Sequence, residues 1–207
     1  MGKMRHMAGR PPSFPVAELE ERVARAAARE FSQHGYEATT IDAIVAASGV
    51  SKPVIYRAFG SKSKLYCTML ERFANELAAA AMESFHQSDG TMVEQLRAII
   101  ESWFAALEGR QDEWRMLNTA ASSDPAVRST IDRIRAMQLS NDATMIRSFL
   151  PELPEPEVEP IAEAVRGSLL AVGAWWIDHP SVDRHVPVNA LTRMYAGVMN
   201  APMGSLG

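Results

Sequence analysis

The fold of this chain follows from the stretch Thr39–Lys64, TTIDAIVAASGVSKPVIYRAFGSKSK. It contains two segments with helical spacing of apolar residues, at about 41–47 and 52–58, which are separated by a short polar turn. Two short helices joined in this way form a helix-turn-helix. Gly49 in the turn can adopt the positive φ that a sharp change of direction requires. The stretch therefore predicts a helix-turn-helix.

The second helix of the pair is expected to enter the major groove of double-stranded DNA, whose width of about 12 Å admits one helix. Arg57 can bind guanine through two hydrogen bonds, and Lys52 can bind a guanine or a phosphate. Pro53 falls in the first turn, where its missing N–H costs little. Tyr56 is either a phosphate contact or a core aromatic, and we favour the phosphate contact. The exposed side chains predicted on this helix are Ser51, Lys52, Val54, Tyr56 and Arg57.

The residues that begin the neighbouring helices also point to a polyanion. Thr40 is the expected N-cap of the first short helix, and Ser61 is the expected N-cap of a long helix that follows. Lys62 and Lys64 fill the first turn of that long helix, where each cation opposes the helix dipole by about 0.3–1 kcal/mol. A phosphate at this N-terminus would reverse the sign, because backbone N–H groups and both lysines would converge on it. The alternative is a pair of solvated lysines without a role.

Apolar residues repeat at intervals of three and four along most of the chain, and strand alternation is nearly absent. The proline-rich segment 150–160, LPELPEPEVEP, is predicted to be a loop until about Pro156. The sequence thus predicts an all-α protein with about nine helices. Their expected ranges are 16–33, 41–47, 52–58, 62–86, 93–107, 112–121, 125–149, 157–178 and 188–200.

Composition limits the class of protein. The chain has 207 residues, of which 47% are hydrophobic and 22% charged, so it is too apolar for a disordered protein. No apolar run reaches the roughly 18 residues of a membrane span. The single cysteine, Cys67, excludes an internal disulfide and a cysteine zinc cluster, which favours a cytoplasmic protein without a metal or cofactor.

The net charge of −4 is unevenly distributed. Residues 1–72 carry 11 Lys and Arg against 7 Asp and Glu, whereas residues 73–207 carry 10 against 18. A charge step of this kind indicates two modules with different partners, of which only the basic one suits a polyanion. Chance is the alternative explanation of the step.

A set of residues in the N-terminal third has a specific order and spacing. They are Phe31, His34-Gly35-Tyr36, Thr39-Thr40, Ile44, Ala47, Gly49-Val50-Ser51, Tyr56, Phe59, Lys62 and Leu65. Because of this pattern, the segment 16–73 resembles the DNA-binding domain of the TetR family of one-component transcriptional repressors. Two positions depart from the family pattern, Val45 where alanine is common and Ala43 where an acidic residue is common, so the capping box is incomplete.

The resemblance implies a domain division and a set of DNA contacts. Thr40, Tyr56 and Lys62 are implied to bind phosphates, while Ser51 to Val54 and Arg57 face bases. We expect a flexible basic arm at 1–14, a DNA-binding domain at 15–73, and a ligand-binding and dimerisation domain at 74–207. A disordered tail is the alternative for the arm. The predicted DNA-binding residues are Thr39, Thr40, Ser51, Lys52, Pro53, Val54, Tyr56, Arg57, Lys62 and Lys64.

The resemblance also implies an inducer cavity in the C-terminal domain. Large apolar and aromatic side chains, several of them methionines, can line a cavity that tolerates ligands of different shapes. Plain core packing is the alternative for each residue taken alone. We expect a mostly apolar small-molecule ligand. The predicted ligand-binding residues are Trp103, Phe104, Leu107, Trp114, Leu117, Asn118, Met137, Asn141, Met145, Phe149, Trp175 and Trp176.

Apolar stripes on the last two helices predict a homodimer that packs as a four-helix bundle. A two-fold dimer would place its recognition helices about 34–36 Å apart, one turn of DNA, and so requires a palindromic operator. Ligand binding is expected to favour a different separation and to release a repressor from that operator. The predicted interface residues are Ile161, Val165, Leu169, Val172, Leu191, Met194, Tyr195 and Val198.

Three alternatives were weighed. An enzyme requires a nucleophile, a base and an orienting group, and the sequence contains no such set, so we predict no catalytic residue. A helical adaptor that has lost DNA binding conflicts with the intact Thr40, Tyr56 and Lys62. A DNA-binding repressor controlled by a protein partner, or by no ligand, remains an alternative to the ligand-gated form.

Overall fold

The structure is a computed structural model, and it describes residues 15–199. Within this range the chain is entirely helical, which confirms the predicted fold class, and no helix is long and apolar enough to cross a membrane. The N-terminal arm predicted at 1–14 lies outside the described residues. The helices are α1 Val16–Ala38, α2 Ile41–Ser48, α3 Lys52–Phe59, α4 Lys62–Gln87, α5 Met92–Leu107, α6 Gln111–Asn118, α7 Pro125–Phe149, α8 Glu155–Ile177 and α9 His185–Met199.

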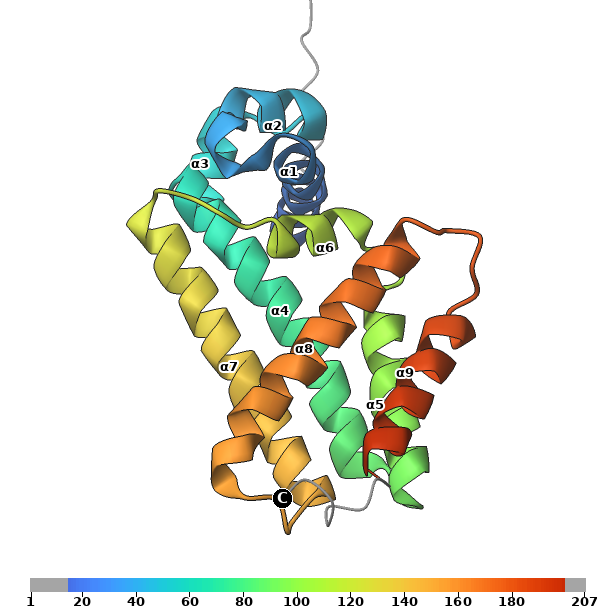
Figure 1. The fold of residues 1–207 in the computed structure, drawn as a ribbon. Helices are drawn as coiled ribbons and strands as arrows, with labels where there is room; N and C mark the ends of the chain where they lie inside the picture. Colours follow the sequence, from blue (N-terminus) through green and yellow to red (C-terminus); the bar gives the residue numbers. More distant parts are fainter. Residues whose placement is uncertain (1–14, 200–207) are drawn as a thin grey trace, which may run out of the picture.

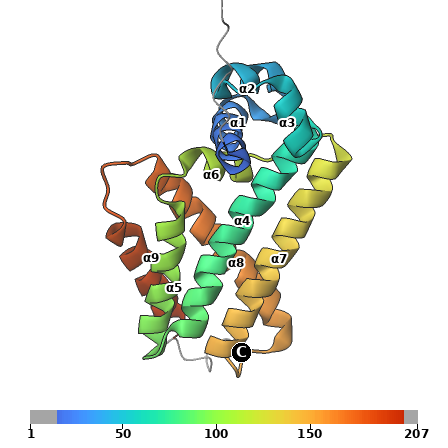
Figure 2. The ribbon, with the colours of Figure 1, turned by 180° about the vertical axis from the view of Figure 1, so that it is seen from behind.

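Helices α1 to α3 form a small unit at one end of the molecule, and α4 runs from this unit along the length of the body (Figure 1). Figure 2 shows the same arrangement from behind, with α4 between α5 and α7. The short helix α6 lies beneath α1, and α8 crosses the body. Since α4 belongs to both ends of the molecule, it connects the helix-turn-helix mechanically to the C-terminal helices.

The turn between α2 and α3 has the predicted geometry. Gly49 has φ 68° and ψ 12°, the left-handed conformation that ends α2, and its N–H donates to the Val45 carbonyl. Ile44 and Ile55, from the two helices, are almost completely buried in the core of this unit. The local sequence therefore folds as expected, because turn geometry and the small core agree.

Several helix boundaries differ from the predicted ones; α6 ends at Asn118 rather than 121, and α9 begins at His185 rather than 188. Helix α1 continues to Ala38 across Gly35, whose φ of 74° and ψ of 170° are not helical, so a kink replaces the predicted end. Helix α8 begins at Glu155 rather than 157 because Pro156 lies in its first turn, where a missing N–H is tolerated. The negative charges of Glu155 and Glu157 in that turn also interact favourably with the positive end of the helix dipole.

The core has two main parts. One joins α1, α2 and α3 to the upper half of α4, to α6 and to the first half of α7. The other joins the lower half of α4 to α5, α8 and α9, and it includes Phe104 and Leu191. A smaller cluster closes the ends of α7 and α8 around Ile146 and Val158. The unit formed by α1 to α3 thus shares its core with the body.

Candidate functional site

Helix α3 packs one side against the core and exposes the opposite side. Ile55 is buried, and Val54 and Phe59 pack partly against the core. Tyr56 is 42% exposed, which places its ring on the outer face as the phosphate interpretation requires. The predicted reader Val54 is half-buried, so its side chain faces the core more than a ligand. The exposed residues of this face are Ser51, Lys52, Pro53, Tyr56 and Arg57.

Lys52 and Asp42 hold α3 against α2. The Lys52 Nζ lies 2.9 Å from the Asp42 Oδ1 and 3.0 Å from its Oδ2. This hydrogen bond raises the pKa of Lys52. Both side chains are exposed, and exposed ion pairs contribute little stability. Lys52 can therefore leave Asp42 for a phosphate or a base at small cost.

The two threonines before α2 have different roles. Thr40 caps the helix, since its Oγ1 accepts from the Ala43 N–H at 3.1 Å, and it is exposed. Thr39 is buried, and its hydroxyl lies 2.7 Å from the Gly35 carbonyl and 3.1 Å from the Glu30 carbonyl. The side chain of Thr39 is buried and its hydroxyl is hydrogen-bonded to carbonyls of α1, so it is not available for the predicted DNA contact.

Lys62 closes the end of α1 instead of pointing outward. Its Nζ donates to the carbonyls of Tyr36 at 2.8 Å, Thr39 at 3.0 Å and Glu37 at 3.3 Å, and it lies 4.4 Å from the centre of the Tyr36 ring. All three ammonium protons have acceptors in this structure, and the phosphate contact of Lys62 stays a prediction. Carbonyls at a helix C-terminus lack helical partners and attract a cation. Lys64, by contrast, is exposed at the start of α4.

The C-terminal helices enclose a cavity of about 470 Å³. Side chains from α4 to α9 line it, and nearly all of them are aliphatic or aromatic. Two tryptophans, Trp103 and Trp114, meet edge to face with ring centres 5.3 Å apart. Gly173 of α8 packs against this pair, since a Cβ at that position would lie 3.0 Å from each ring. The predicted ligand-binding residues that line the cavity are Trp103, Trp114, Leu117, Asn141, Met145 and Phe149.

The other predicted ligand-binding residues lie elsewhere. Phe104 and Leu107 are buried in the core behind the cavity. Trp176 packs on Phe104 and donates from Nε1 to the Val182 carbonyl at 2.9 Å, while Trp175 is exposed and stacks on His179. Successive residues on a helix point about 100° apart, so Trp103 of α5 faces the cavity while its neighbour Phe104 faces the core. The remaining two are Asn118, whose amide donates to the Trp114 carbonyl, and Met137, which packs on the upper core.

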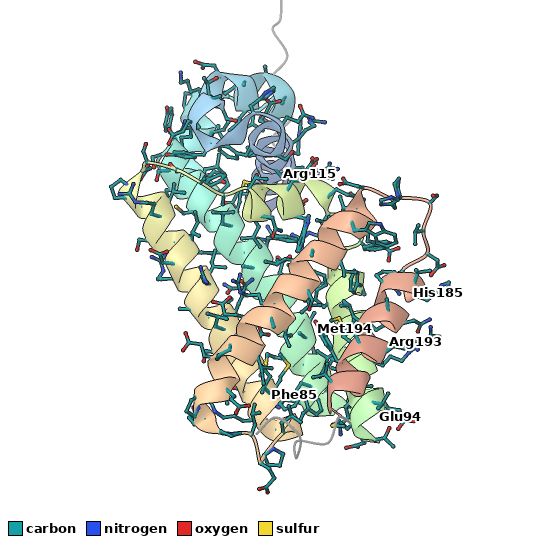
Figure 3. All side chains as sticks on the ribbon, in the orientation of Figure 1. Phe85, Glu94, Arg115, His185, Arg193 and Met194 are labelled. Carbon is teal, nitrogen blue, oxygen red and sulfur yellow. The ribbon has the colours of Figure 1, made fainter. Side chains whose placement is uncertain are left out.

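The apolar stripes predicted for a dimer interface mostly face inward. Leu191 is buried, and Val172 packs on the lower core. The chain's own helices bury Leu191 and Tyr195 and half-bury Ile161, Val165, Leu169 and Val172, while Met194 and Val198 are exposed at 45% and 66%; their role in a dimer stays a prediction. Figure 3 places Met194 on the side of α9 toward α8 and Arg193 on the outer side. The predicted interface residues that line the cavity are Ile161, Val165, Leu169, Met194, Tyr195 and Val198.

Comparison with known families agrees with this geometry. Residues 24–67 match the model of the bacterial regulatory proteins of the tetR family, and residues 92–197 match that of the tetracyclin repressor-like C-terminal domain. The chain belongs to the TetR family. The family and its relatives are transcription regulators rather than enzymes. This confirms the predicted resemblance to the TetR family and the prediction that the protein is not an enzyme.

Individual TetR-family relatives match at different lengths. The transcriptional activator FasR of Mycolicibacterium smegmatis is 31% identical over 104 residues, 50% of this chain and 47% of FasR, so the chain spans about half the length of this curated relative. A TetR-like regulator from Rhodococcus superposes with a TM-score of 0.73 at 24% identity, over 91% of this chain and all of that one. Bacillus subtilis FadR, solved with stearoyl-CoA, has a TM-score of 0.70 at 16% identity, over 84% and 96%.

Polar contacts that the sequence did not reveal join the DNA-binding unit to α7. Tyr36 donates from its hydroxyl to the Asp124 carboxylate at 2.8 Å, and Glu37 accepts from the hydroxyls of Ser122 at 2.7 Å and Ser123 at 3.1 Å. Asp124 also caps α7 by accepting from the Ala126 N–H. These partners are more than 80 residues apart, so no local pattern could have paired them.

Proposed function

We propose that this TetR-family chain is a ligand-gated repressor that a mostly apolar small molecule releases from a palindromic DNA operator. The observation that carries this proposal is that two helices belong to both sites. Helix α4 begins beside α3 and lines the cavity through Leu77, Ala81 and Met82. Helix α7 begins at the Tyr36–Asp124 contact and lines the cavity further along. A ligand that shifts either helix would move the DNA-reading unit.

The proposed DNA contacts come from one end of the molecule. Arg57 is the proposed base reader, because a guanidinium can donate two hydrogen bonds to guanine. Tyr56 and Lys64 are proposed to contact phosphates. Thr40, the exposed N-cap of α2, is proposed as a third phosphate contact. The complete proposed set is Thr40, Ser51, Lys52, Pro53, Tyr56, Arg57 and Lys64. We propose domain limits of 15–73 and 74–207, although α4 is continuous across them.

A homodimer is proposed through the outer face of α8 together with α9. Exposed small residues on α8 permit close approach of a second helix, and Trp175, Met194 and Val198 add exposed apolar area beside them. Two helices from each chain would form a four-helix bundle related by a two-fold axis. The small residues on this face are Ala164, Gly167, Ala171 and Ala174.

The proposed ligand has an apolar body that fits the cavity. The lining offers aromatic rings and flexible methionines, which suit an extended hydrocarbon. A fold relative that holds stearoyl-CoA supports a long apolar ligand at the level of the fold. The name of FasR indicates activation in that relative, so a reporter assay with the operator decides the direction of regulation in this one.

The experiment is selection of bound sequences from random duplex DNA, followed by sedimentation of the complex. We expect a palindrome with half-sites one DNA turn apart, bound by two chains. Arg57→Ala should lower affinity for this sequence and leave affinity for random DNA nearly unchanged. Ala171→Glu should shift the chain toward monomer, whereas Ala126→Glu, exposed on α7, should not. Absence of any selected sequence would contradict the proposal.

A further inference from the structure

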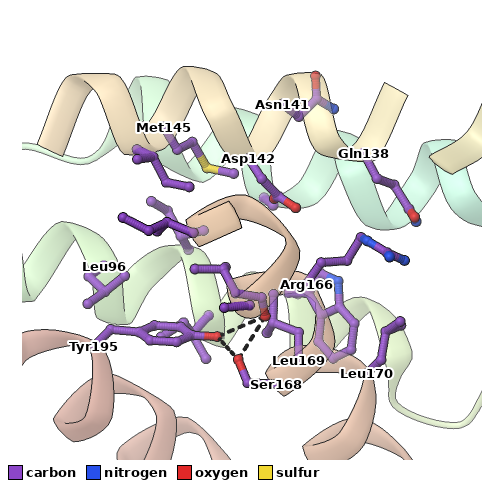
Figure 4. A pocket seen from close by; sticks show the side chains of 18 of the residues that line it. Leu96, Gln138, Asn141, Asp142, Met145, Arg166, Ser168, Leu169, Leu170 and Tyr195 are labelled. Carbon is purple, nitrogen blue, oxygen red and sulfur yellow. Dashed lines mark hydrogen bonds between the residues drawn. The ribbon is translucent and has the colours of Figure 1, made fainter. Parts of the chain in front are cut away.

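The wall of the cavity carries one polar region. Asp142 on α7 points across the cavity toward α8, which carries Arg166 and Ser168, and Tyr195 of α9 lies beyond it, while Asn141 turns away from them (Figure 4). Asp142, Ser168 and Tyr195 are called the polar subsite below. Helices α4, α5 and α6 contribute only apolar side chains to the lining. A ligand in this cavity therefore meets hydrocarbon on one side and the polar subsite on the other.

The two hydroxyls of the polar subsite have no proton left for a ligand. Ser168 Oγ donates to the Val165 carbonyl at 2.8 Å and lies 2.6 Å from Tyr195 Oη. Tyr195 Oη also lies 3.2 Å from the Val165 carbonyl. Each hydroxyl owns a single proton, and both protons are used within this triangle. The pair consequently offers only lone pairs to the cavity.

Asp142 adds a third acceptor without a protein donor. Within residues 15–199 its carboxylate makes no hydrogen bond or ion pair. Burial raises the pKa of Asp142 to about 7, while the charge of Arg166 acts in the opposite direction. Arg166 is itself engaged, since its Nη2 donates to Glu163 at 2.7 Å. The carboxylate is therefore a group whose hydrogen-bonding capacity is unmet.

We propose that the polar subsite recognises a protonated amine, so that the ligand of this regulator is a lipophilic amine whose hydrocarbon body fills the cavity. This inference rests on the proposed function for the existence of a ligand. An ammonium group supplies donors to the Asp142 carboxylate, which has none, and to the remaining lone pairs of the two hydroxyls, and it compensates the charge of Asp142. A charge-assisted hydrogen bond of this kind is about twice as strong as a neutral one.

The other polar lining residues do not favour an anion over this cation. Gln138 and Asn141 carry amides, which both donate and accept. Arg166 could attract a ligand carboxylate through its Nε, which is buried without an acceptor, but Glu163 already binds its Nη2 and the Asp142 carboxylate offsets part of its charge. A ligand carboxylate would also lie beside the Asp142 carboxylate. The balance of partners thus points to a donor on the ligand.

The test compares three probes that share one chain and differ in the head group: decylamine, decanol and decanoate. Their affinities for the full chain are measured by isothermal titration calorimetry below the micelle concentration of each. We expect decylamine to bind about tenfold more tightly than decanol, and decanoate most weakly. Asp142→Asn should lower decylamine affinity about tenfold and change decanol affinity little. Asp132→Asn, exposed on the same helix, is the matched control and should change neither.

The outcomes separate this inference from the proposed function. Equal decylamine affinity in wild type and Asp142→Asn, or tighter binding of decanoate than of decylamine, overturns the polar subsite while ligand gating stands. Failure of all three probes to bind overturns both. Selective binding of decylamine without any change in DNA affinity supports the polar subsite and contradicts gating by this ligand.

The pH dependence gives a second readout. The charged or titratable side chains around Asp142 are Arg166 and Glu163 from α8 and Tyr195 from α9, and the pKa of Tyr195 is raised to about 12 by burial. Decylamine stays protonated at neutral pH, as a lysine side chain does. Its affinity should rise as pH increases through about 7, where Asp142 ionises, and the rise should vanish in Asp142→Asn. A flat profile in wild type would contradict the inference.

Discussion

Tyr36 donates a hydrogen bond of 2.8 Å to the carboxylate of Asp124, and this contact joins the end of α1 to the first turn of α7. The same carboxylate accepts from the Ala126 N–H, so it caps α7 while it holds the tyrosine. Helix α7 continues from this point to the cavity wall. In the proposed mechanism, movement of α7 against a ligand is transmitted to the helix-turn-helix through this polar contact.

Tyr36→Phe removes this contact and keeps the ring. We expect a bound ligand to change DNA affinity up to about fivefold less in this variant than in wild type, because one hydrogen bond contributes about 1 kcal/mol. DNA affinity is measured by fluorescence anisotropy with and without a cavity ligand. Arg147→Gln, which removes an exposed ion pair at the other end of α7, is the control and should retain the wild-type response. An unchanged response in Tyr36→Phe would show that the contact transmits nothing.

Acid should weaken the same contact. Hydrogen bonds from Tyr36 and from the Ala126 N–H hold the pKa of Asp124 below its usual value of 3.8. A carboxyl with a lowered pKa in the folded state stabilises the fold above its unfolded pKa, and this contribution is lost as pH falls through the folded value. In urea unfolding at a series of pH values, Asp124→Asn should therefore lose less stability than wild type as pH falls below about 4. Parallel curves for the two proteins would contradict this account of Asp124.

The two lysines at the start of α4 should behave differently. Lys62→Gln should lower the free energy of unfolding by about 1 kcal/mol, because carbonyls at the end of α1 lose a charged donor, and it should leave the salt dependence of DNA binding unchanged. Lys64→Gln should leave stability unchanged and reduce the slope of log affinity against log salt by about one. Urea unfolding and a salt titration measure these effects. A reduced slope for Lys62→Gln would instead support the predicted phosphate contact of Lys62.

Gly173→Ala tests the close packing of α8 on the cavity wall. The added methyl would lie 3.0 Å from the rings of Trp103 and Trp114, so one of the helices must move. Overpacking of this kind costs about 1–3 kcal/mol. Gly197→Ala on α9, which is not among the proposed small interface residues and where no atom lies within 4 Å, should instead stabilise the helix by about 0.5–1 kcal/mol. Urea unfolding and tryptophan fluorescence measure both; equal stability of the two variants would contradict the packing described here.

The sequence predicted the helix-turn-helix well because its determinants are local. Gly49, the Thr40 cap and the buried Ile44 and Ile55 all act within a few turns of one another. The position of Lys62 in the first turn of α4 is evident from the sequence and predicts a phosphate contact. The α1 carbonyls that it binds are more than 20 residues away.

The C-terminal half was predicted less completely for a physical reason. An apolar stripe shows that a helix face is covered, but not whether the same chain or a second one covers it. The stripes around Val165 and Leu191 therefore appeared to be a dimer interface, although the chain covers them itself. The sequence did not predict a role for Asp142, because the residues on the other side of the cavity belong to α8 and α9, far away in the chain; the prediction named its neighbour Asn141 instead.

Reciprocal coupling between the cavity and the DNA is the most direct test of ligand gating. The affinity of the full chain for its selected operator is measured with and without a saturating cavity ligand, and the affinity for that ligand is measured with and without operator. The account predicts that the ligand lowers the affinity for the operator, and the operator lowers the affinity for the ligand, by the same factor of about 5–150. Independent binding of the two, with both affinities unchanged, would contradict it.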